Sequence, residues 1–295
     1  MMDGVFNINK PEGITSFDVV RKVRHLSKIR KVGHAGTLDP IASGVLPLCL
    51  GGATKFVDYI MKDEKVYLTC MKLGIRTDTY DREGTVLEIL DFDLSEKDVE
   101  DVILSFEGEI EQIPPMYSAI KVNGKRLYDL ARQGIEVERK KRKVNIYSIK
   151  ILNMDLPYVI FEVRCSKGTY IRSLCNDIGD RLNCGAVMWS LKRTSTGNFH
   201  ISDSIDLKDL NRENILQYIA PVDTALTQYP AVNLEDVYIK NVLNGIPIAD
   251  RMFLDKISKN RLYRVYIYKN EFVGLGIYRT VEFKMVKLFI RSNRL

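Results

Sequence analysis

Short runs of alternating apolar and polar residues recur along the chain, and a few segments with helical spacing separate them. A period of two is typical of strands that bury one face. We therefore expect strands at residues 5–9, 64–74, 158–168, 264–270, 272–279 and 285–291. In the second of these, Tyr67 lies on the face opposite Val66, Leu68 and Cys70.

Four segments have the spacing of amphipathic helices. They are residues 15–28, 95–108, 124–134 and 169–185. The first opens with Thr15 and Asp18, which are spaced as in a capping box, and its residues Phe17, Val20 and Val23 predict one apolar face.

The order of these elements predicts an α+β protein in two parts. A boundary near Tyr229 and Pro230 divides residues 1–228 from residues 229–295. The second part consists of short alternating runs separated by turns, which predict a small β domain.

The composition is that of an ordinary globular chain, since 45% of the 295 residues are hydrophobic and 28% are charged. No run of about 18 apolar residues is present, and the first residues hold an early acid and no apolar signal core. We therefore expect a cytoplasmic protein that does not enter a membrane. The five cysteines include no C-x-x-C pair, which favours buried reduced thiols over disulfides or a zinc site.

The net charge of +6 is distributed unevenly. Residues 121–150 hold ten Lys or Arg against three acids, and residues 251–295 hold eleven against three. Between them, residues 81–111 hold twelve acids against two bases. Two basic zones separated by an acidic one favour an extended polyanion, such as nucleic acid, as the partner. For the basic run at residues 139–143, a solvated turn is the alternative.

The loop KVGHAGTLDPIASGVLPLCLG, residues 31–51, holds a single acid, Asp39, among glycines and apolar residues. Pro40 favours an extended conformation at Asp39, which places this acid on a loop, where a local Asx turn is the alternative to a chemical role. A carboxylate sealed from water needs a partner. Arg172 is a candidate, unless it is a surface arginine with a local pair. Tyr67 offers a flat ring for a base, or packs as an ordinary core residue.

Other chemistries lack their motifs. The chain contains neither G-x-G-x-x-G after a strand, nor the P-loop pattern, nor the nucleophile elbow G-x-S-x-G. His25, His34 and His200 are scattered and have no second ligand at metal-binding spacing. We therefore expect an acid that acts without a metal or a cofactor.

Five segments together resemble the TruB-type tRNA pseudouridine-55 synthases and follow the order of that family. They are NKPEGITSFDVV, KVGHAGTLDPIASGVLPLCLGGATKF, KVYLTCMKLGIRTDTYDREG, IPPMYSAIKVNGKRLYDLARQGIEV and CSKGTYIRSLCNDIG. The resemblance is strong over residues 5–200 and weaker from YPAVNLEDV onward. Runs of this length are far more specific than a single short pattern.

The resemblance implies a fold and a reaction. The fold would be the pseudouridine-synthase core, a mixed, largely antiparallel sheet with flanking helices, followed by a PUA-like β domain. The reaction would convert uridine in the TΨC loop of tRNA to pseudouridine by flipping the base out and by aspartate-dependent cleavage and re-formation of the glycosidic bond. The family uses no cofactor and no metal for it.

The resemblance also implies roles for single residues. Asp39 matches the essential aspartate, which would act on the ribose, on the ring or as a base on the sugar. Arg172 matches the arginine that pairs with it, and Tyr67 matches the tyrosine that stacks on the target base and assists proton removal at ring carbon 5. Substrate contacts are expected from His34, Tyr67, Tyr170, Leu191 and Lys10.

Residues 110–145 resemble an inserted lobe that closes over the RNA loop. Phosphate contacts are expected there from Lys125, Arg126, Arg132, Arg139, Lys140, Lys141, Arg142 and Lys143. We expect tRNA as the partner of a monomer that needs no other protein. A guide-RNA-dependent relative and a non-catalytic RNA-binding or tRNA-folding protein on the same scaffold are the alternatives.

Overall fold

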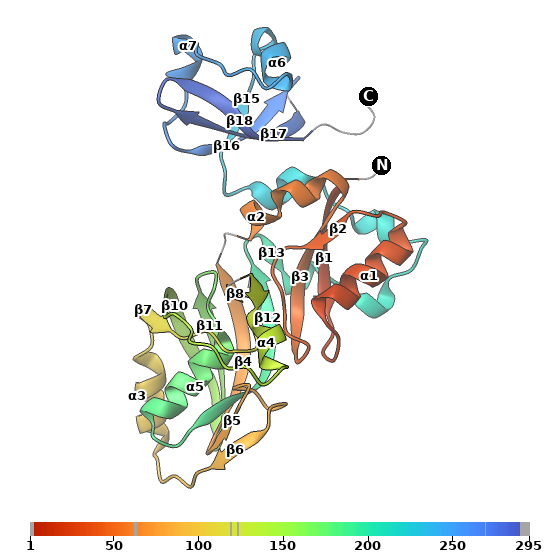
Figure 1. The fold of residues 1–295 in the computed structure, drawn as a ribbon. Helices are drawn as coiled ribbons and strands as arrows, with labels where there is room; N and C mark the ends of the chain where they lie inside the picture. The colour runs from red at the N-terminus through yellow and green to blue at the C-terminus, as the bar shows by residue number, and fades with distance from the viewer. Residues whose placement is uncertain (1–2, 62–63, 119, 123, 269, 290–295) are drawn as a thin grey trace.

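The computed structural model describes residues 3–61, 64–118, 120–122, 124–268 and 270–289. Within them the chain forms a large mixed sheet with helices against it and a separate four-stranded sheet near the C-terminus (Figure 1). The large sheet has ten strands in the described part of the chain, in the order β14-β1-β3-β12-β4-β11-β10-β7, with β2 paired to β3 and β13 paired to β12. Only β1 with β14 and β3 with β12 pair in parallel among these strands, so the expected mixed, largely antiparallel sheet is confirmed.

The strands of the large sheet have the following bounds: β1 (Gly4–Lys10), β2 (Val32–His34), β3 (Ala42–Leu50), β4 (Lys65–Leu73), β7 (Gly108–Gln112), β10 (Arg142–Asp155), β11 (Tyr158–Cys165), β12 (Ala186–Thr196), β13 (Phe199–His200) and β14 (Ile205–Asp206). Two small hairpins stand apart from it, β5 (Ile75–Thr77) with β6 (Val86–Ile89), and β8 (Lys121–Val122) with β9 (Lys125–Arg126). The helices of this part are α1 (Ser16–Ser27), α2 (Val57–Ile60), α3 (Glu96–Leu104), α4 (Leu127–Ala131) and α5 (Ile171–Arg181).

Capping boxes start two of the helices where the sequence predicts them. The Thr15 side chain accepts from the backbone of Asp18 at the start of α1, and Ser95 does the same with Asp98 at the start of α3. The apolar face of α1 differs from the prediction. Val20 and Val23 are buried as expected, but Phe17 is 55% exposed, because it lies about a third of a turn outside the buried face.

Helix α5 carries Arg172 and lies against the large sheet. Its buried apolar face consists of Ile171, Leu174, Cys175 and Ile178. Asp177 in the same helix is half-buried, and desolvation, followed by the nearby charge of Asp180, raises its pKa to about 6. The raised pKa means that the ionised carboxylate of Asp177 is less stable in the fold than its neutral form, relative to water.

The basic run at residues 139–143 belongs partly to a strand. Arg142 and Lys143 begin β10, where they pair with Gln112 and Glu111 of β7. The sequence pattern did not predict this, because the partner strand is some thirty residues away and rich in acids. Residues 113–141, which connect the two strands, lie off the sheet and contain β8, β9 and α4.

The C-terminal part forms its own sheet in the order β15-β16-β17-β18, so the expected small β domain is confirmed. Its elements are β15 (Ala231–Asn233), α6 (Asp236–Leu243), α7 (Arg251–Leu254), β16 (Leu262–Ile267), β17 (Glu271–Arg279) and β18 (Glu282–Leu288). The two helices were not predicted. Short 3-10 turns at Ile201–Asp203, Leu207–Asp209, Ile215–Tyr218 and Val222–Leu226 precede it, and another, Gly51–Phe56, follows β3.

An aromatic cluster joins this domain to the large sheet. The ring of Phe56 is fully buried, 5.7 Å from Phe272 and 5.9 Å from Phe289 between centroids. The cluster extends to Cys49 on β3 and Ala35, so it lies directly behind the strand that follows the Asp39 loop. No helix among the described residues is long and apolar enough to cross a membrane.

Replacing Phe56 by Ala is expected to lower the free energy of unfolding by about 3–5 kcal/mol, because it leaves a cavity between the two parts. Urea unfolding followed by circular dichroism measures this. Leu87→Ala, at a residue of β6 that is 66% exposed, is the control and is expected to change stability by about 0.5 kcal/mol or less. Equal effects of the two substitutions would contradict the assignment of the cluster.

Asp177→Asn is expected to raise the free energy of unfolding at pH 7 by about 1–2 kcal/mol, a value reduced for the partial exposure of the group. The folded pKa of about 6 lies above the ordinary 3.8, so the native protein binds the extra proton and loses stability as pH rises through this window. The difference between variant and wild type should therefore vanish near pH 4. A difference that does not depend on pH would contradict this explanation.

Candidate active site

The loop between β2 and β3 presents Asp39, and the start of α1 holds this loop in place. The buried hydroxyl of Ser16 donates to the carbonyl of Leu38 and accepts from its amide, both at 2.9 Å. The amide of Gly13 donates to the carbonyl of Pro40 at 2.9 Å. The residues on both sides of Asp39 are thus fixed to the chain around α1, and the carboxylate stands on a supported backbone.

Lys10 supports the same loop from beneath. Its side chain is fully buried, and its ammonium donates to the carbonyls of Pro11 and Ile14 at 2.8 and 2.7 Å, with that of Pro40 at 3.4 Å. Burial lowers its pKa to about 8, against the opposing effect of Asp39. The three donors of Lys10 are directed at backbone carbonyls of the protein, so its expected contact with substrate stays a prediction.

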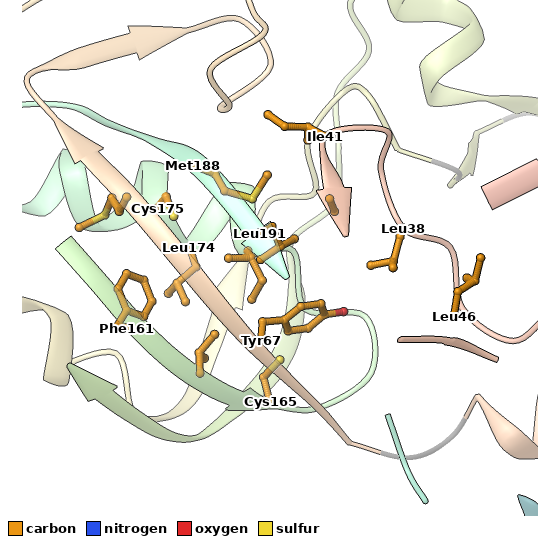
Figure 2. Close-up of a cluster of buried hydrophobic side chains, with 14 of the residues drawn as sticks. Leu38, Ile41, Leu46, Tyr67, Phe161, Cys165, Leu174, Cys175, Met188 and Leu191 are labelled. Atoms are coloured by element: carbon orange, nitrogen blue, oxygen red, sulfur yellow. The ribbon is translucent and has the colours of Figure 1, made fainter. Parts of the chain in front are cut away.

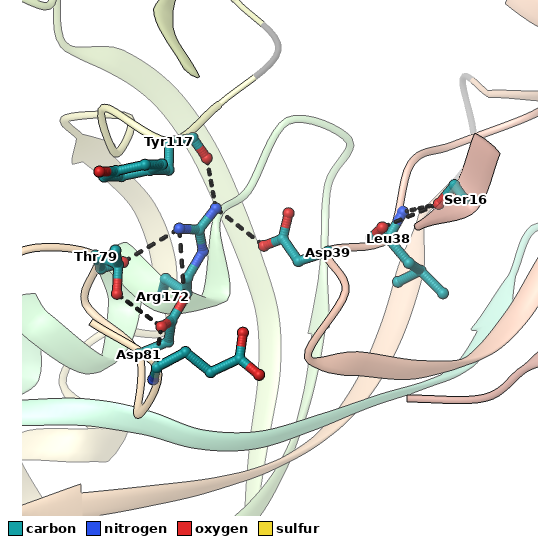
Figure 3. A network of polar contacts seen from close by, with 8 residues as sticks. Ser16, Leu38, Asp39, Thr79, Asp81, Tyr117 and Arg172 are labelled. Atoms are coloured by element: carbon teal, nitrogen blue, oxygen red, sulfur yellow. Dashed lines mark hydrogen bonds and ion pairs between the residues drawn. The ribbon is translucent and has the colours of Figure 1, made fainter. Parts of the chain in front are cut away.

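Arg172 connects Asp39 to two other segments, the loop of Thr79 and Asp81 and the segment of Tyr117 (Figure 3). Its Nη2 lies 2.9 Å from Asp39 Oδ2 and donates to the carbonyl of Tyr117 at 2.7 Å. Its Nη1 donates to the carbonyl of Thr79 at 3.1 Å and lies 3.5 Å from Asp81 Oδ2. Residues other than Asp39 therefore hold the guanidinium in place, and it contacts the Asp39 carboxylate from this fixed position.

Arg172 is buried, whereas Asp39 is partly exposed, so the arginine fixes the orientation of the carboxylate. The side chain of Arg172 is 5% exposed, whereas that of Asp39 is 38% exposed. Oδ1 of Asp39 has no hydrogen bond to any residue that the structure describes. A buried cation thus fixes one oxygen and leaves the other free, and the structure excludes the alternative of a surface arginine with a local pair.

Tyr67 and Arg193 form a cross-strand pair beside this ion pair. They lie directly opposite each other on β4 and β12, and the Arg193 cation favours the ionised phenol, although burial still raises the pKa of Tyr67. Arg193 is 1% exposed, and it also donates to the carbonyls of Val45 at 2.8 Å and Gly36 at 3.0 Å. One guanidinium opposite the tyrosine therefore joins Gly36 of the Asp39 loop to Val45 of β3, the strand that follows it.

Close approach of β3 to β12 depends on a glycine at this point. Gly44 has a φ of +104°, and a Cβ there would lie 2.2 Å from the carbonyl oxygen of Arg193. Any other residue would push the two strands apart. The glycines of the opening motif thus allow strand contact rather than phosphate binding.

The ring of Tyr67 lies in the core, 7% exposed. Figure 2 shows it among Leu38, Leu46, Cys165 and Leu191, with its hydroxyl directed toward Leu38. Burial raises the pKa of the phenol, and the Arg193 cation opposes this change. The ring is therefore close to the Asp39 loop but covered.

The other expected substrate contacts lie around this group. His34 on β2 is half-buried, its Nδ1 has no hydrogen-bond partner among the described residues, and burial, with the Arg193 cation, lowers its pKa. Tyr170 precedes α5 and is half-buried, which raises its pKa, and its backbone is held by Gln112. Leu191 is 9% exposed in the same core cluster as Tyr67.

The basic residues of the expected RNA-binding segment have varied surroundings. Arg139 donates to the carbonyl of Pro114 at 3.1 Å, and its side chain is 15% exposed. Lys141 and Lys143 pair with Glu111 at 3.7 Å and Glu109 at 2.7 Å. Arg132, Lys140 and Arg142 are exposed, while the side chains of Lys125 and Arg126 lie outside the described part of the structure. Much of the positive charge of residues 139–143 is thus balanced within the protein.

Two residues of the site were missed in the sequence. Arg193 follows Leu191 by two positions, so the period of a strand would have placed it on the same face as an expected pocket residue. Asp81 is one of several acids in DTYDREG, and no local signal distinguishes the one that is buried. Within the described ranges, no group of three or more His, Cys, Asp or Glu side chains is arranged to hold a metal ion.

Comparison with known proteins identifies the family. Residues 24–171 match the model of the TruB family pseudouridylate synthase, N-terminal domain, and residues 172–227 match the tRNA pseudouridylate synthase B C-terminal domain. A tRNA pseudouridine synthase B of Clostridium kluyveri is 64% identical, over 98% of this chain and 100% of its own length. One from Clostridium acetobutylicum is 55% identical over 97% of this chain and 99% of its own length. The chain belongs to the TruB family of pseudouridylate synthases.

Solved structures show the same fold in a different setting. The chain resembles one in an H/ACA ribonucleoprotein bound to a substrate RNA containing 2′-deoxyuridine, with a TM-score of 0.74, 28% identity and coverage of 98% of this chain and 86% of that chain. A Cbf5-Nop10-Gar1 complex gives a TM-score of 0.73 at 29% identity, over 98% of this chain and 84% of that one.

Arg193→Met is expected to lower the free energy of unfolding by about 2–4 kcal/mol, because the carbonyls of Gly36 and Val45 lose a buried donor. Arg193→Lys should recover part of this loss, since a lysine keeps the charge but not the planar fork. Urea unfolding of the two variants measures both values. A methionine variant as stable as the wild type would show that the loop does not depend on this guanidinium.

Proposed function

We propose that this chain isomerises uridine 55 in the T loop of tRNA to pseudouridine, as a stand-alone enzyme. The observation that carries the proposal is the ion pair between buried Arg172 and partly exposed Asp39, which leaves one carboxylate oxygen free beside Tyr67. Relatives with 64% and 55% identity that are named tRNA pseudouridine synthase B support tRNA as the substrate.

The reaction is an isomerisation and needs no oxidant, reductant or added water. The C1′–N1 bond of uridine breaks, a C1′–C5 bond forms, and the proton on C5 is transferred to N1. Covalent attack on the ribose, attack on the ring and proton removal from the sugar all place the free Oδ1 of Asp39 against the nucleoside. Arg172 keeps that oxygen directed at it.

The flipped uridine enters a covered pocket. Extrusion of a base from a folded loop costs a few kcal/mol and is offset by stacking and edge contacts. Tyr67 supplies the stacking surface and assists proton removal at C5, and the Arg193 cation opposite it favours the ionised phenol. Because the ring of Tyr67 is only 7% exposed, Leu191 and its neighbours must move when the base enters. They then separate the reacting bond from water. His34 and Tyr170 line the approach.

RNA is held from two sides in this proposal. The catalytic domain comprises residues 1–228, and its segment around residues 110–145 closes over the T loop with Arg132, Lys140 and Arg142. The PUA-like domain, residues 229–295, contacts the acceptor end. The carbonyl of Tyr117 supports this arrangement, because it ties the segment to the same Arg172 that holds Asp39.

The alternatives have less support. The solved relatives inside ribonucleoproteins are 28% and 29% identical to this chain, well below the relatives named for tRNA. A non-catalytic RNA-binding or tRNA-folding protein would not need a pocket with Asp39, Arg172 and Tyr67 together. We place the enzyme in the cytoplasm as a monomer without an obligate protein partner, a location that five free thiols favour.

Asp39→Asn is expected to reduce conversion of an unmodified tRNA transcript by at least about 10³-fold while it leaves tRNA affinity within about threefold. Mass spectrometry of the product and filter binding measure the two quantities. Asp58→Asn, at an exposed residue of α2, is the matched control and should convert tRNA at the wild-type rate.

Two outcomes would refute the proposal. Conversion by wild-type protein only after a guide RNA is added would favour the ribonucleoprotein alternative. Unchanged conversion by the Asp39 variant would exclude the carboxylate from the reaction.

A further inference from the structure

One face of α1 combines an exposed aromatic ring with a row of cations. Phe17, Arg21 and Arg24 follow one another at spacings of four and three residues, which places them on one side of α1, and Lys28 is the C-cap directly after its last residue. We call these four residues the α1 stripe. The buried residues Ser16, Val19, Val20 and Val23 face a different direction, toward the sheet.

The exposed ring of the stripe is flanked by two guanidinium groups. Phe17 is 55% exposed, and the guanidinium groups of Arg21 and Arg24 each lie 5.9 Å from its centroid. An exposed ring flanked by guanidinium groups is the combination on which unpaired bases stack. An ordinary core phenylalanine would instead be buried, as the sequence pattern had predicted here.

The charge around the stripe is strongly one-sided. Residues 19–38 contain six Lys or Arg and no Asp or Glu. Lys28, Arg30 and Lys31 are exposed, and their side chains form no hydrogen bond or ion pair with any residue in the described ranges. Arg21 pairs with Asp18, whose carboxylate also caps the helix. By contrast, Lys141, which precedes β10, and Lys143, which lies in it, are each opposed by a glutamate.

The stripe begins at the active-site loop. Ser16, next to Phe17, makes the two hydrogen bonds that fix Leu38, and Leu38 precedes Asp39. Arg24 donates to the carbonyl of Val32 at 2.9 Å, in the strand that leads to His34 and the same loop. From Ser16 to Ser27 the helix is about 18 Å long, the axial length of about five nucleotides of one strand. The stripe therefore starts beside the loop that presents Asp39.

We propose that the α1 stripe, extended by Arg30 and Lys31, binds the RNA strand that flanks the target uridine. Phe17 with its two guanidinium groups stacks on an unpaired base of that strand, and Lys28, Arg30 and Lys31 contact its phosphates. This inference rests on the proposed function, since it assigns part of the substrate to a surface outside the pocket.

The test measures RNA binding at several salt concentrations, with an unmodified tRNA transcript and with the T-arm stem-loop cut from it. Phe17→Ala is expected to weaken binding of both RNAs by about 5- to 20-fold. Phe17→Trp should restore it, because a larger ring can still stack. The double substitution of Lys28 and Lys31 by Gln should make the salt dependence shallower by about 1.5 in logarithmic slope.

Matched controls separate the stripe from charge in general. Lys22→Gln removes a cation from another face of the same helix, where the ammonium donates to the carbonyl of Leu207, and should leave the slope unchanged. Substituting Lys141 and Lys143 by Gln should change the slope less than the stripe variant does. Thermal unfolding of every variant identifies any loss of folding. Because Phe17 is exposed, its substitution is expected to leave the melting temperature nearly unchanged.

Several results would overturn the proposal. They are wild-type affinity and slope in the stripe variants, equal effects from Lys22→Gln, a larger effect from Lys141 and Lys143, and an effect confined to full-length tRNA. Failure of the proposed function has a separate signature, namely wild-type protein that binds tRNA through the stripe and converts none of it.

Discussion

The buried guanidinium of Arg172 is the interaction on which the site depends. It joins Asp39, the loop around Asp81 and the segment that contains Tyr117, three parts of the chain that no sheet pairing holds together at this point. A cation with 5% exposure in this position is stabilised only while these partners surround it. The geometry of the carboxylate and the attachment of the neighbouring segment are therefore consequences of the same charge.

A second buried cation organises the other side of the pocket. Arg193 has no carboxylate partner in the described ranges, and its donors reach the carbonyls of Gly36 and Val45. It lies directly opposite Tyr67 in the sheet. The two arginines therefore act differently. One holds the reactive side chain, and the other holds the backbone from which that side chain projects.

The sequence predicted six of the eighteen strands and four of the seven helices in the described ranges, and the pairing of Arg172 with Asp39, because the signals of these elements are local or periodic. Thr15 and Asp18 mark a helix start, and Tyr67 follows the alternation of a strand. Phe17 was assigned wrongly, since spacing shows which residues share a face but not how far a neighbouring element covers them. The strand that begins at Arg142 was missed because its charges are matched by Glu109 and Glu111, far away in the sequence. The burial of Asp81 and Lys10 likewise depends on tertiary contacts.

The aromatic cluster behind β3 has a consequence for how the chain can be divided. Phe272 and Phe289 belong to the C-terminal domain, yet they cover Cys49, Ala53 and Phe56 of the catalytic part. Excision of this domain would expose an apolar surface on the back of the strand that follows the Asp39 loop, and such surfaces promote self-association. The two domains are thus not interchangeable modules, and any fusion or truncation would have to supply polar residues at these positions.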